Sequence, residues 1–262
     1  IRKAISKPYG LILITGPTGS GKSTTLYSML NELDREKANV VSLEDPVEYH
    51  MANVNQSQVM PEIGYTFASG LRSILRQDPD IIMVGEIRDK ETAQLAIQAA
   101  LTGHLDLSTL HTNTAIGAIP RLVDMGVDPY LIAPTLILTM AQRLVKTIYE
   151  PAKQTVPMDG IVSKYIQDTF ADLPDSTRST ISIPNTMNIF SPTADCPTGL
   201  RGRMAVFEML EIDQDIQKMI LTNPVEQEIY KVARSKGMIT LKEDALMKSL
   251  AGHVPLQEVY GL

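Results

Sequence analysis

The stretch LILITGPTGSGKSTTLYS, residues 11–28, places a glycine-rich turn directly after an apolar run and directly before a helical pattern. Residues 16–23 match G-x-x-x-x-G-K-[ST] in full, and a strand–turn–helix context is the setting in which that pattern binds phosphate. We therefore predict that the turn and the helix start after it bind a nucleotide through Gly16, Pro17, Thr18, Gly19, Ser20, Gly21, Lys22, Ser23 and Thr24.

Each residue type in this loop has a physical task. Glycines allow backbone N–H groups to turn inward around a β-phosphate, and a helix that starts near Gly21 adds its N-terminal dipole. Lys22 supplies a point charge for the β- and γ-phosphates, and Ser23 supplies a hydroxyl ligand for Mg²⁺. The loop alone does not separate a kinase, a GTPase and a motor ATPase. The guanine-specifying pattern N-K-x-D is absent from the sequence, which favours ATP.

Composition excludes several classes of protein. The 262 residues carry a net charge of −6, which argues against the broad basic surface of a nucleic-acid-binding protein. The one cysteine, Cys196, excludes an internal disulfide framework and suits a reducing cytosol. The longest apolar candidate, LIAPTLILTMA from Leu131, is shorter than the about 18 residues of a membrane span, so we expect no membrane insertion. Because the chain begins at Ile1 rather than at methionine, we expect it to be an excerpt of a longer protein.

The order of apolar runs and helical patterns predicts an α/β fold. Short apolar runs alternate with helical patterns up to residue 148, which predicts a mainly parallel sheet with helices on both faces. The runs are LILIT at 11–15, NVVSL at 39–43, DIIMV at 80–84 and LDLSTL at 105–110. We predict a P-loop core of the RecA-like type over residues 1–148, an irregular arm or subdomain over 149–200 and a small helical lobe over 201–262. Capping patterns at Asn223-Pro224-Val225-Glu226 and Thr240-Leu241-Lys242-Glu243 predict two helix starts in this lobe.

Acidic residues follow two of the predicted strands. In open α/β sheets, ligands bind beyond the carboxyl ends of the strands, and Glu86 lies at that end of the run 80–84. Asp80 lies at the other end, roughly 20 Å away along the strand, so the two carboxylates cannot share one ion. We predict that Glu86 holds the Mg²⁺ ion through water and polarises the attacking water, whereas Asp78 and Asp80 orient the strand entrance.

The segment NVVSLEDPVEYH repeats this arrangement, with Glu44, Asp45 and Glu48 after the strand. Pro46 makes the turn rigid, and Glu48 is then predicted to face the γ-phosphate and to accept a proton from water or to orient it. A polar loop whose acids cap a helix is the alternative for Glu48, and more so for Glu44.

A histidine lies on each side of the predicted strand 105–110. His104 precedes this strand and His111 follows it, so the pair cannot bind one metal ion across the strand. We predict that His111 senses the γ-phosphate or braces the acids, with a purely structural histidine as the alternative at either position.

Taken in order, these segments resemble the boxes of the motor ATPases of type II secretion and type IV pilus systems, over nearly the whole chain. The phosphate loop is followed by EDPVEY, which is similar to an aspartate box, and by LRSILRQDPDIIMVGEIRD, which is similar to a Walker-B box. TGHLDLSTLHTN is similar to a histidine box, and AQRLVK and GLRGRMAVFEML follow in the family's order.

The resemblance implies a role for each matching residue. It implies that Lys22 and Ser23 bind ATP and Mg²⁺, that Glu86 serves the metal site and that Glu48 activates water. It implies that His104 and His111 couple the site to movement, a role to which we add Arg88 as a candidate. It also implies a cytoplasmic homo-hexamer, peripheral to the inner face of the cytoplasmic membrane, that works against an inner-membrane platform protein.

Two departures from the family pattern matter. Assembly-type members often bind zinc through two C-x-x-C pairs, but here the first pair falls at Tyr149 and Ala152, the second falls near Pro192 and Asp195, and Cys196 stands alone. A zinc site of this kind needs about four good ligands, so we predict no structural zinc. The arm is nevertheless long, which indicates the assembly or secretion branch rather than the retraction branch.

The second departure concerns an amino-terminal domain. The resemblance implies such a domain, but the sequence leaves no room for it before residue 11. In the family that domain supplies arginines to the nucleotide. Within this chain, Arg72, Arg76 and Arg88 are the cations that could replace them, with local pairing to Asp78, Asp89 or Glu86 as the alternative.

Other functions remain open at this point. A P-loop small-molecule kinase needs an arginine-rich acceptor lid, whereas the arm holds only Lys153, Lys164 and Arg178. A nucleotide-responsive scaffold with little turnover would be favoured by the loss of Lys22, Glu48 or Glu86, all of which are present. A DNA-moving relative is compatible with the fold but not favoured by the acidic charge balance.

Overall fold

A computed structural model describes residues 1–181, 188–193 and 199–262 of the chain. Its residues cluster into two compact units that alternate along the chain. The first unit combines Ile1–Ala141 with Leu210–Tyr230, and the second combines Gln142–Met209 with Lys231–Leu262. The boundaries predicted at residues 148 and 200 remain an interpretation of the sequence.

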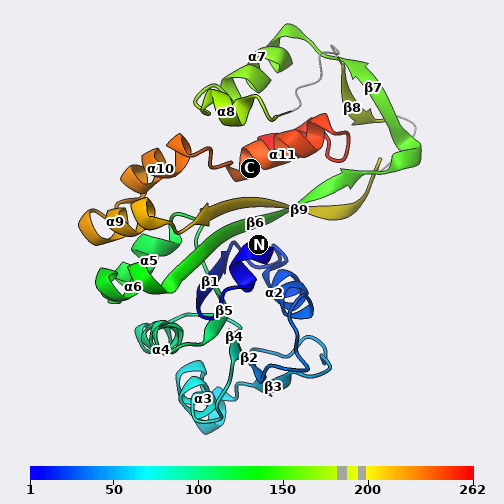
Figure 1. Cartoon of the computed structure of the whole chain (residues 1–262). Helices are drawn as coiled ribbons and strands as arrows, with labels where there is room; N and C mark the ends of the chain where they lie inside the picture. Colours follow the sequence, from blue (N-terminus) through cyan, green and yellow to red (C-terminus); the bar gives the residue numbers. More distant parts are fainter. Residues whose placement is uncertain (182–187, 194–198) are drawn as a thin grey trace. The chain divides into compact units, whose positions relative to one another are not determined.

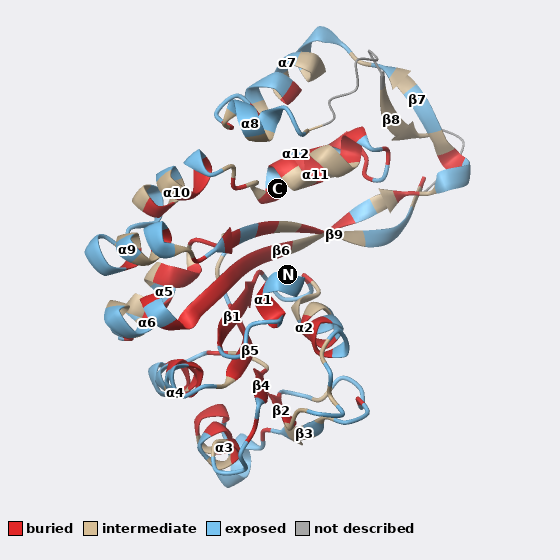
Figure 2. Cartoon of the chain, in the orientation of Figure 1, coloured by how far each residue is buried: buried red, intermediate tan, exposed pale blue. Residues whose placement is uncertain are grey.

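Within the described residues, one sheet of seven strands has the order β3-β2-β4-β5-β1-β6-β9. The five strands β3, β2, β4, β5 and β1 pair in parallel, and β6 pairs in parallel with β1, so the predicted mainly parallel α/β fold is confirmed. The strands are β1 (Gly10–Thr15), β2 (Val40–Glu44), β3 (Asn55–Gln58), β4 (Ile81–Val84), β5 (Leu105–Leu110), β6 (Leu136–Ile148) and β9 (Leu200–Glu211). All residues of β1, β4 and β5 are buried (Figure 2), as expected for parallel strands covered on both faces.

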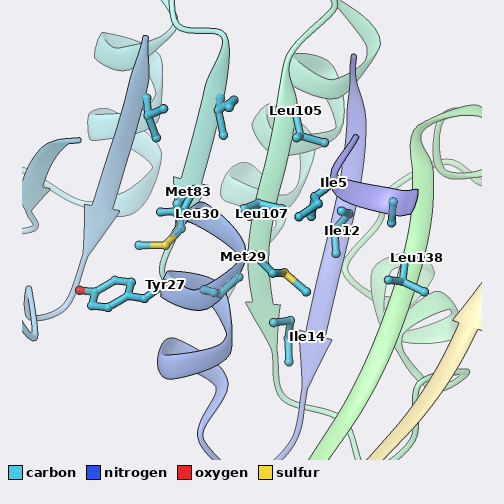
Figure 3. Close-up of a cluster of buried hydrophobic side chains, with 14 of the residues drawn as sticks. Ile5, Ile12, Ile14, Tyr27, Met29, Leu30, Met83, Leu105, Leu107 and Leu138 are labelled. Atoms are coloured by element: carbon cyan, nitrogen blue, oxygen red, sulfur yellow. The ribbon is translucent and has the colours of Figure 1, made fainter. Parts of the chain in front are cut away.

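Helices of the first unit cover both faces of its strands (Figure 1). Alternate side chains of β1, β4 and β5 pack with Tyr27 and Leu30 of α2 in one apolar cluster, shown in Figure 3. The helices α3 and α4 pack against the opposite side of the strands. The helical elements of this unit are α1 (Arg2–Ile5), α2 (Lys22–Asn31), η1 (Pro61–Ile63), α3 (Phe67–Ile74), α4 (Lys90–Leu101), α5 (Ala118–Asp124), α6 (Pro129–Thr135) and α9 (Gln214–Thr222).

Local sequence signals start several of these helices. Thr66 and Ser69 form a capping box at α3, and the Asp89 carboxylate accepts from the backbone N–H of Thr92 at α4. The capping box predicted at Thr240 is confirmed at α11 (Leu241–Leu250). The start predicted at Pro224, with Asn223 as its cap, is wrong: α10 (Glu226–Ser235) begins two residues later, and the backbone N–H groups of Glu228 and Ile229 donate to the carbonyl oxygen of Val225, which takes the cap position.

The second unit contains regular elements where the sequence suggested an irregular arm. These are η2 (Glu150–Ala152), β7 (Lys153–Pro157), α7 (Gly160–Thr169), α8 (Asp175–Arg178) and β8 (Asn188–Pro192), with β7 and β8 paired antiparallel. The same unit also contains α11 and α12 (Leu256–Tyr260), which lie within residues 201–262. Arg234 lies buried in this unit and donates to Glu243, to Asp172 and to the carbonyl oxygen of Met238, the last at 2.6 Å.

Candidate nucleotide site

The carboxyl ends of four parallel strands meet at one edge of the sheet, and the polar residues singled out from the sequence follow those ends. The strands β2, β4, β5 and β1 are consecutive neighbours. Register pairs Leu43 with Val84, Val84 with Ser108, and Leu110 with Thr15. The residue two positions beyond Val84 is Glu86, which is therefore level with Leu110 and with the start of the phosphate loop. The topology thus places Glu86 at the same sheet edge as this loop, with β5 between the two strands that carry them.

The loop between β1 and α2 has the backbone of a phosphate cradle. Gly16, Gly19 and Gly21 have φ angles of 142°, 79° and 87°, a region that favours glycine. A Cβ atom at Gly19 would project into open space, with no heavy atom within 4 Å. In a glycine-rich turn of this kind, backbone N–H groups can bind the oxygens of a phosphate group.

Lys22 is the first residue of α2, one position after the predicted start, and its side chain lies over the loop. Its Nζ atom donates to the carbonyl oxygens of Gly16 at 2.8 Å and Pro17 at 3.1 Å. Ser23 and Thr24 are exposed in the first helical turn. One cation and two hydroxyls therefore lie at one helix N-terminus, a combination that fits a nucleotide's phosphates and a Mg²⁺ ion.

Glu86 is held from two sides by cationic or ionisable partners. His111 Nε2 lies 2.7 Å from Glu86 Oε1, and Arg88 Nε donates to Glu86 Oε2 at 2.8 Å. Arg88 also reaches Asp45, at 3.3 Å, and its pairing with Glu86 raises the pKa of the guanidinium above its usual value. We call Glu86, His111, Arg88 and Asp45 the edge cluster. The edge cluster joins the ends of β2, β4 and β5. It contains His111 but not His104, the other histidine considered from the sequence.

Backbone and hydroxyl contacts fix the segment that carries Glu86. Ser108 donates to the carbonyl oxygen of Val84 and Thr109 to that of Gly85, each at 2.7 Å. A Cβ atom at Gly85 would lie 3.2 Å from the carbonyl oxygen of Leu43, a tight contact, so glycine suits the close passage of β4 past β2. The sequence analysis did not single out Ser108 and Thr109, although two hydroxyls inside a buried strand are a signal that such contacts exist.

Glu48 lies in the loop that follows β2, and its side chain is exposed. Glu44, by contrast, is buried as the last residue of β2. Its carboxylate accepts from the side chains of Tyr27, Ser42 and Gln56. The alternative that Glu44 caps a helix is therefore wrong.

The remaining predicted residues lie elsewhere. His104 lies at the opposite, amino-terminal end of β5, where its Nδ1 atom is 2.8 Å from the carbonyl oxygen of Ala99. Arg72 pairs with Glu91 rather than with the acids considered for it. Asp80 accepts from the backbone N–H of Asn39 at 2.7 Å, which matches the predicted role at the strand entrance.

The acidic and imidazole groups of the described chain do not form a preassembled metal site. No group of three or more His, Cys, Asp or Glu residues among the described positions could hold an ion. This fits Mg²⁺, which usually keeps several waters and takes one or two protein ligands beside substrate phosphates. Two of the positions considered for zinc, Asp195 and Cys196, lie outside the described residues, so the absence of zinc stays a prediction.

The sheet, the loop and the acids beyond β4 define a P-loop protein of the α/β class. The chain belongs to the family described as Type II/IV secretion system protein, which matches residues 1–261. This confirms the family suggested by the ordered boxes of the sequence.

Individual relatives support the assignment. The Type II secretion system ATPase E of Vibrio cholerae is 45% identical over 262 residues, covering 98% of this chain and 49% of that protein. The Type IV pilus assembly ATPase PilB of Thermus thermophilus is also 45% identical, covering 98% of this chain and 28% of that protein. The chain thus spans about half the length, or less, of the curated relatives it matches.

Solved structures agree with the fold. The pilus retraction motor PilT with bound ADP superposes with a TM-score of 0.71 and 30% identity, covering 99% of this chain and 62% of that one. The Legionella pneumophila ATPase DotB gives a TM-score of 0.69 and 28% identity, covering 99% of this chain and 61% of that one. A search of the described helices finds none with the length and apolar character that a bilayer crossing requires.

Proposed function

We propose that this chain is the ATP-hydrolysing core of a motor that powers type IV pilus assembly or type II protein secretion. The observation that carries the proposal is the position of Glu86: its side chain is only 16% exposed, His111 and Arg88 hold it, and it lies at the same sheet edge as a complete phosphate loop. A carboxylate in that position suits the handling of a metal-bound or attacking water. Two relatives at 45% identity are themselves named ATPases of these systems, which supports the same reading.

We assign the chemical roles as follows. The backbone of residues 16–24 and the Lys22 ammonium bind the phosphates, and the Ser23 hydroxyl is a Mg²⁺ ligand. Glu86 orients a water of the metal shell, and Glu48 accepts a proton from the attacking water or orients it. Mg²⁺, when bound, neutralises charge on the reacting phosphoryl group.

The edge cluster suggests how the site is coupled to movement. His111 follows β5 and Arg88 follows β4, and both contact the same Glu86 carboxylate. A change in charge beside Glu86 therefore acts on two strand ends at once. We propose His111 and Arg88 as coupling residues, whereas His104 would have to act through the end of α4.

For the whole protein we propose a cytoplasmic homo-hexamer, peripheral to the inner face of the cytoplasmic membrane. Its proposed partner is the inner-membrane platform protein of the pilus or secretion machine. Family membership supports these assignments, and the net charge of −6 supports the absence of a nucleic-acid partner.

The test is to incubate the purified chain with Mg²⁺ and ATP and to measure ADP, free phosphate and ATP affinity together. We expect equal amounts of ADP and free phosphate. Lys22→Ala should weaken ATP binding by about tenfold or more, because a charge-assisted contact is worth roughly 1.5–3 kcal/mol. Lys37→Ala is the matched control, since Lys37 is exposed and forms its ion pair with Asp34, three residues before it.

Other outcomes would overturn the proposal. ADP without free phosphate would indicate transfer to an acceptor, as in a kinase. Tight ATP binding without any turnover would indicate a nucleotide-responsive scaffold. Equal ATP affinity in the Lys22→Ala variant and the wild type would contradict the assignment of the loop.

A further inference from the structure

A buried polar network lies where β2 ends and links α2 to the loop that carries Glu48. At its centre is Glu44, a residue that is only 4% exposed. Its carboxylate accepts from the Tyr27 hydroxyl, from Ser42 Oγ at 2.5 Å and from Gln56 Nε2 at 3.1 Å. Three donors satisfy a carboxylate that has left water, so the network is complete around Glu44.

The Tyr27 hydroxyl has a second partner. It accepts from the backbone N–H of Glu48 at 3.3 Å while it donates to Glu44. Burial, first of all, raises the pKa of Tyr27 to about 12, so the hydroxyl keeps its proton at neutral pH. In Figure 3 the Tyr27 ring lies at one margin of the apolar cluster, with its oxygen directed away from the other labelled side chains. The Tyr27 ring thus packs in the apolar core, whereas its hydroxyl bonds to the loop that carries Glu48.

Side chains of β3 hold the same loop at further points. Gln56 Oε1 accepts from the backbone N–H of Met51 at 2.7 Å, and Gln56 Nε2 donates to the carbonyl oxygen of Tyr49 at 3.1 Å. Gln58 Oε1 accepts from the backbone N–H of Val47 at 3.3 Å. Residues 47–51 are therefore fixed mainly through their backbone. The Glu48 side chain remains exposed, but the position of the backbone from which it extends is defined.

We propose that Tyr27 is a positioning residue for Glu48, and that it ties the placement of Glu48 to the helix that begins at Lys22. Tyr27 lies five positions after Lys22 on α2, and backbone hydrogen bonds make that helix rigid. The phosphate-binding end of α2 and the Glu48 backbone are then held in a fixed position relative to each other. The inference rests on the proposed function, in which Glu48 acts on water at the same site.

This role predicts a particular kinetic effect. Removing the Tyr27 hydroxyl leaves the phosphate loop, Lys22 and Ser23 unchanged, so ATP affinity and KM should stay within about twofold. A small misplacement of a reacting group costs up to about 100-fold in rate, so kcat should fall by about 10- to 100-fold.

The test compares Tyr27→Phe with Tyr65→Phe. Tyr65 is the matched control because its hydroxyl also forms a hydrogen bond, to Ser57 of β3 at 2.9 Å, and among the described residues it has no hydrogen bond to Glu44 or Glu48. Hydrogen exchange is measured over residues 45–51 in each full chain, beside kcat and KM for ATP. We expect faster exchange in this segment and the lower kcat in Tyr27→Phe alone.

A double variant shows whether Tyr27 acts through Glu48. If it does, Tyr27→Phe should change kcat by less than about twofold in a Glu48→Gln background, because coupled residues are not additive. Unchanged exchange over 45–51 in Tyr27→Phe would overturn the proposed contact. Faster exchange with an unchanged kcat, or the full kcat loss in the Glu48→Gln background, would overturn the positioning role. A wild type without turnover would instead refute the proposed function, and hydrogen exchange would still decide the contact.

Discussion

Two groups of charged side chains in this molecule use the same chemistry in different surroundings. The edge cluster pairs Glu86 with His111 and Arg88, whose side chains are 48% and 56% exposed. The buried cluster of the second unit pairs Arg234 with Glu243 and Asp172, and the first two side chains are only 7% and 2% exposed.

This difference in burial decides what each cluster can do. A charge that has lost its water depends on its partners, so the buried cluster is a fixed structural element. Partners that remain in contact with water can exchange one contact for another at low cost. Carboxylate–cation contacts therefore indicate a functional site only where the partners can rearrange, as they can around Glu86.

The largest expected effect on stability comes from breaking the buried cluster. Arg234→Met should lower the free energy of unfolding by about 3–5 kcal/mol, because it leaves the Glu243 carboxylate buried without its cation. Arg178→Met is the matched control: Arg178 pairs with an exposed Asp175, and its loss should cost less than about 1 kcal/mol. Urea denaturation followed by circular dichroism measures both. Equal losses in the two variants would show that burial does not separate the clusters.

A smaller effect is expected at Asp106, a buried acid that lacks such a cluster. Asp106 is 1% exposed in β5, and neither carboxyl oxygen has a hydrogen-bond partner among the described residues. Burial raises its pKa well above the usual value, so the folded state favours the protonated form. The stability of the wild type should therefore fall as pH rises from the unfolded-state pKa of about 3.9 towards the raised folded-state value.

Replacing Asp106 tests this pH dependence. Asp106→Asn removes the titration at nearly constant shape, so the variant should become more stable than the wild type as pH rises. The amide of the variant stays neutral without taking up a proton, so the gain at pH 8 should be at least about 1.4 kcal/mol, the value of one pKa unit, and it should shrink towards pH 4. Urea denaturation at pH 4, 6 and 8 measures it. A stability difference that is the same at all three pH values would contradict the burial of an unpaired acid.

Much of the fold and part of the site could be predicted from the sequence, because both depend on local patterns. Apolar runs without alternation predicted strands buried on both faces, and the phosphate loop with its flanking elements fixed one end of the sheet. Ligands of open α/β sheets bind beyond the carboxyl ends of the strands. This rule distinguished Glu86 and His111, which lie at those ends, from Asp80 and His104, which lie at the opposite ends.

The rest depends on which strands become neighbours, which local patterns do not contain. The contact of Arg88 with both Glu86 and Asp45 requires β4 to lie beside β2. Tyr27 lies in the helical pattern after the phosphate loop, and the partners of its hydroxyl become known only once the end of β2 is placed beside it. Asp106 could have been noticed as a charge inside an apolar run, although burial without a partner is a property of the folded chain.

Turnover by the Glu86→Gln variant is the most direct test of the central claim that the edge cluster serves ATP hydrolysis. ATP affinity, phosphate release and the free energy of unfolding are measured for the wild type, for Glu86→Gln and for Glu62→Gln, an exposed control outside the cluster. We predict that Glu86→Gln binds Mg²⁺–ATP within about threefold of the wild type and keeps its stability within about 1 kcal/mol. Its phosphate release should fall by about 10²–10⁴-fold. Equal phosphate release by the wild type and Glu86→Gln would contradict the account.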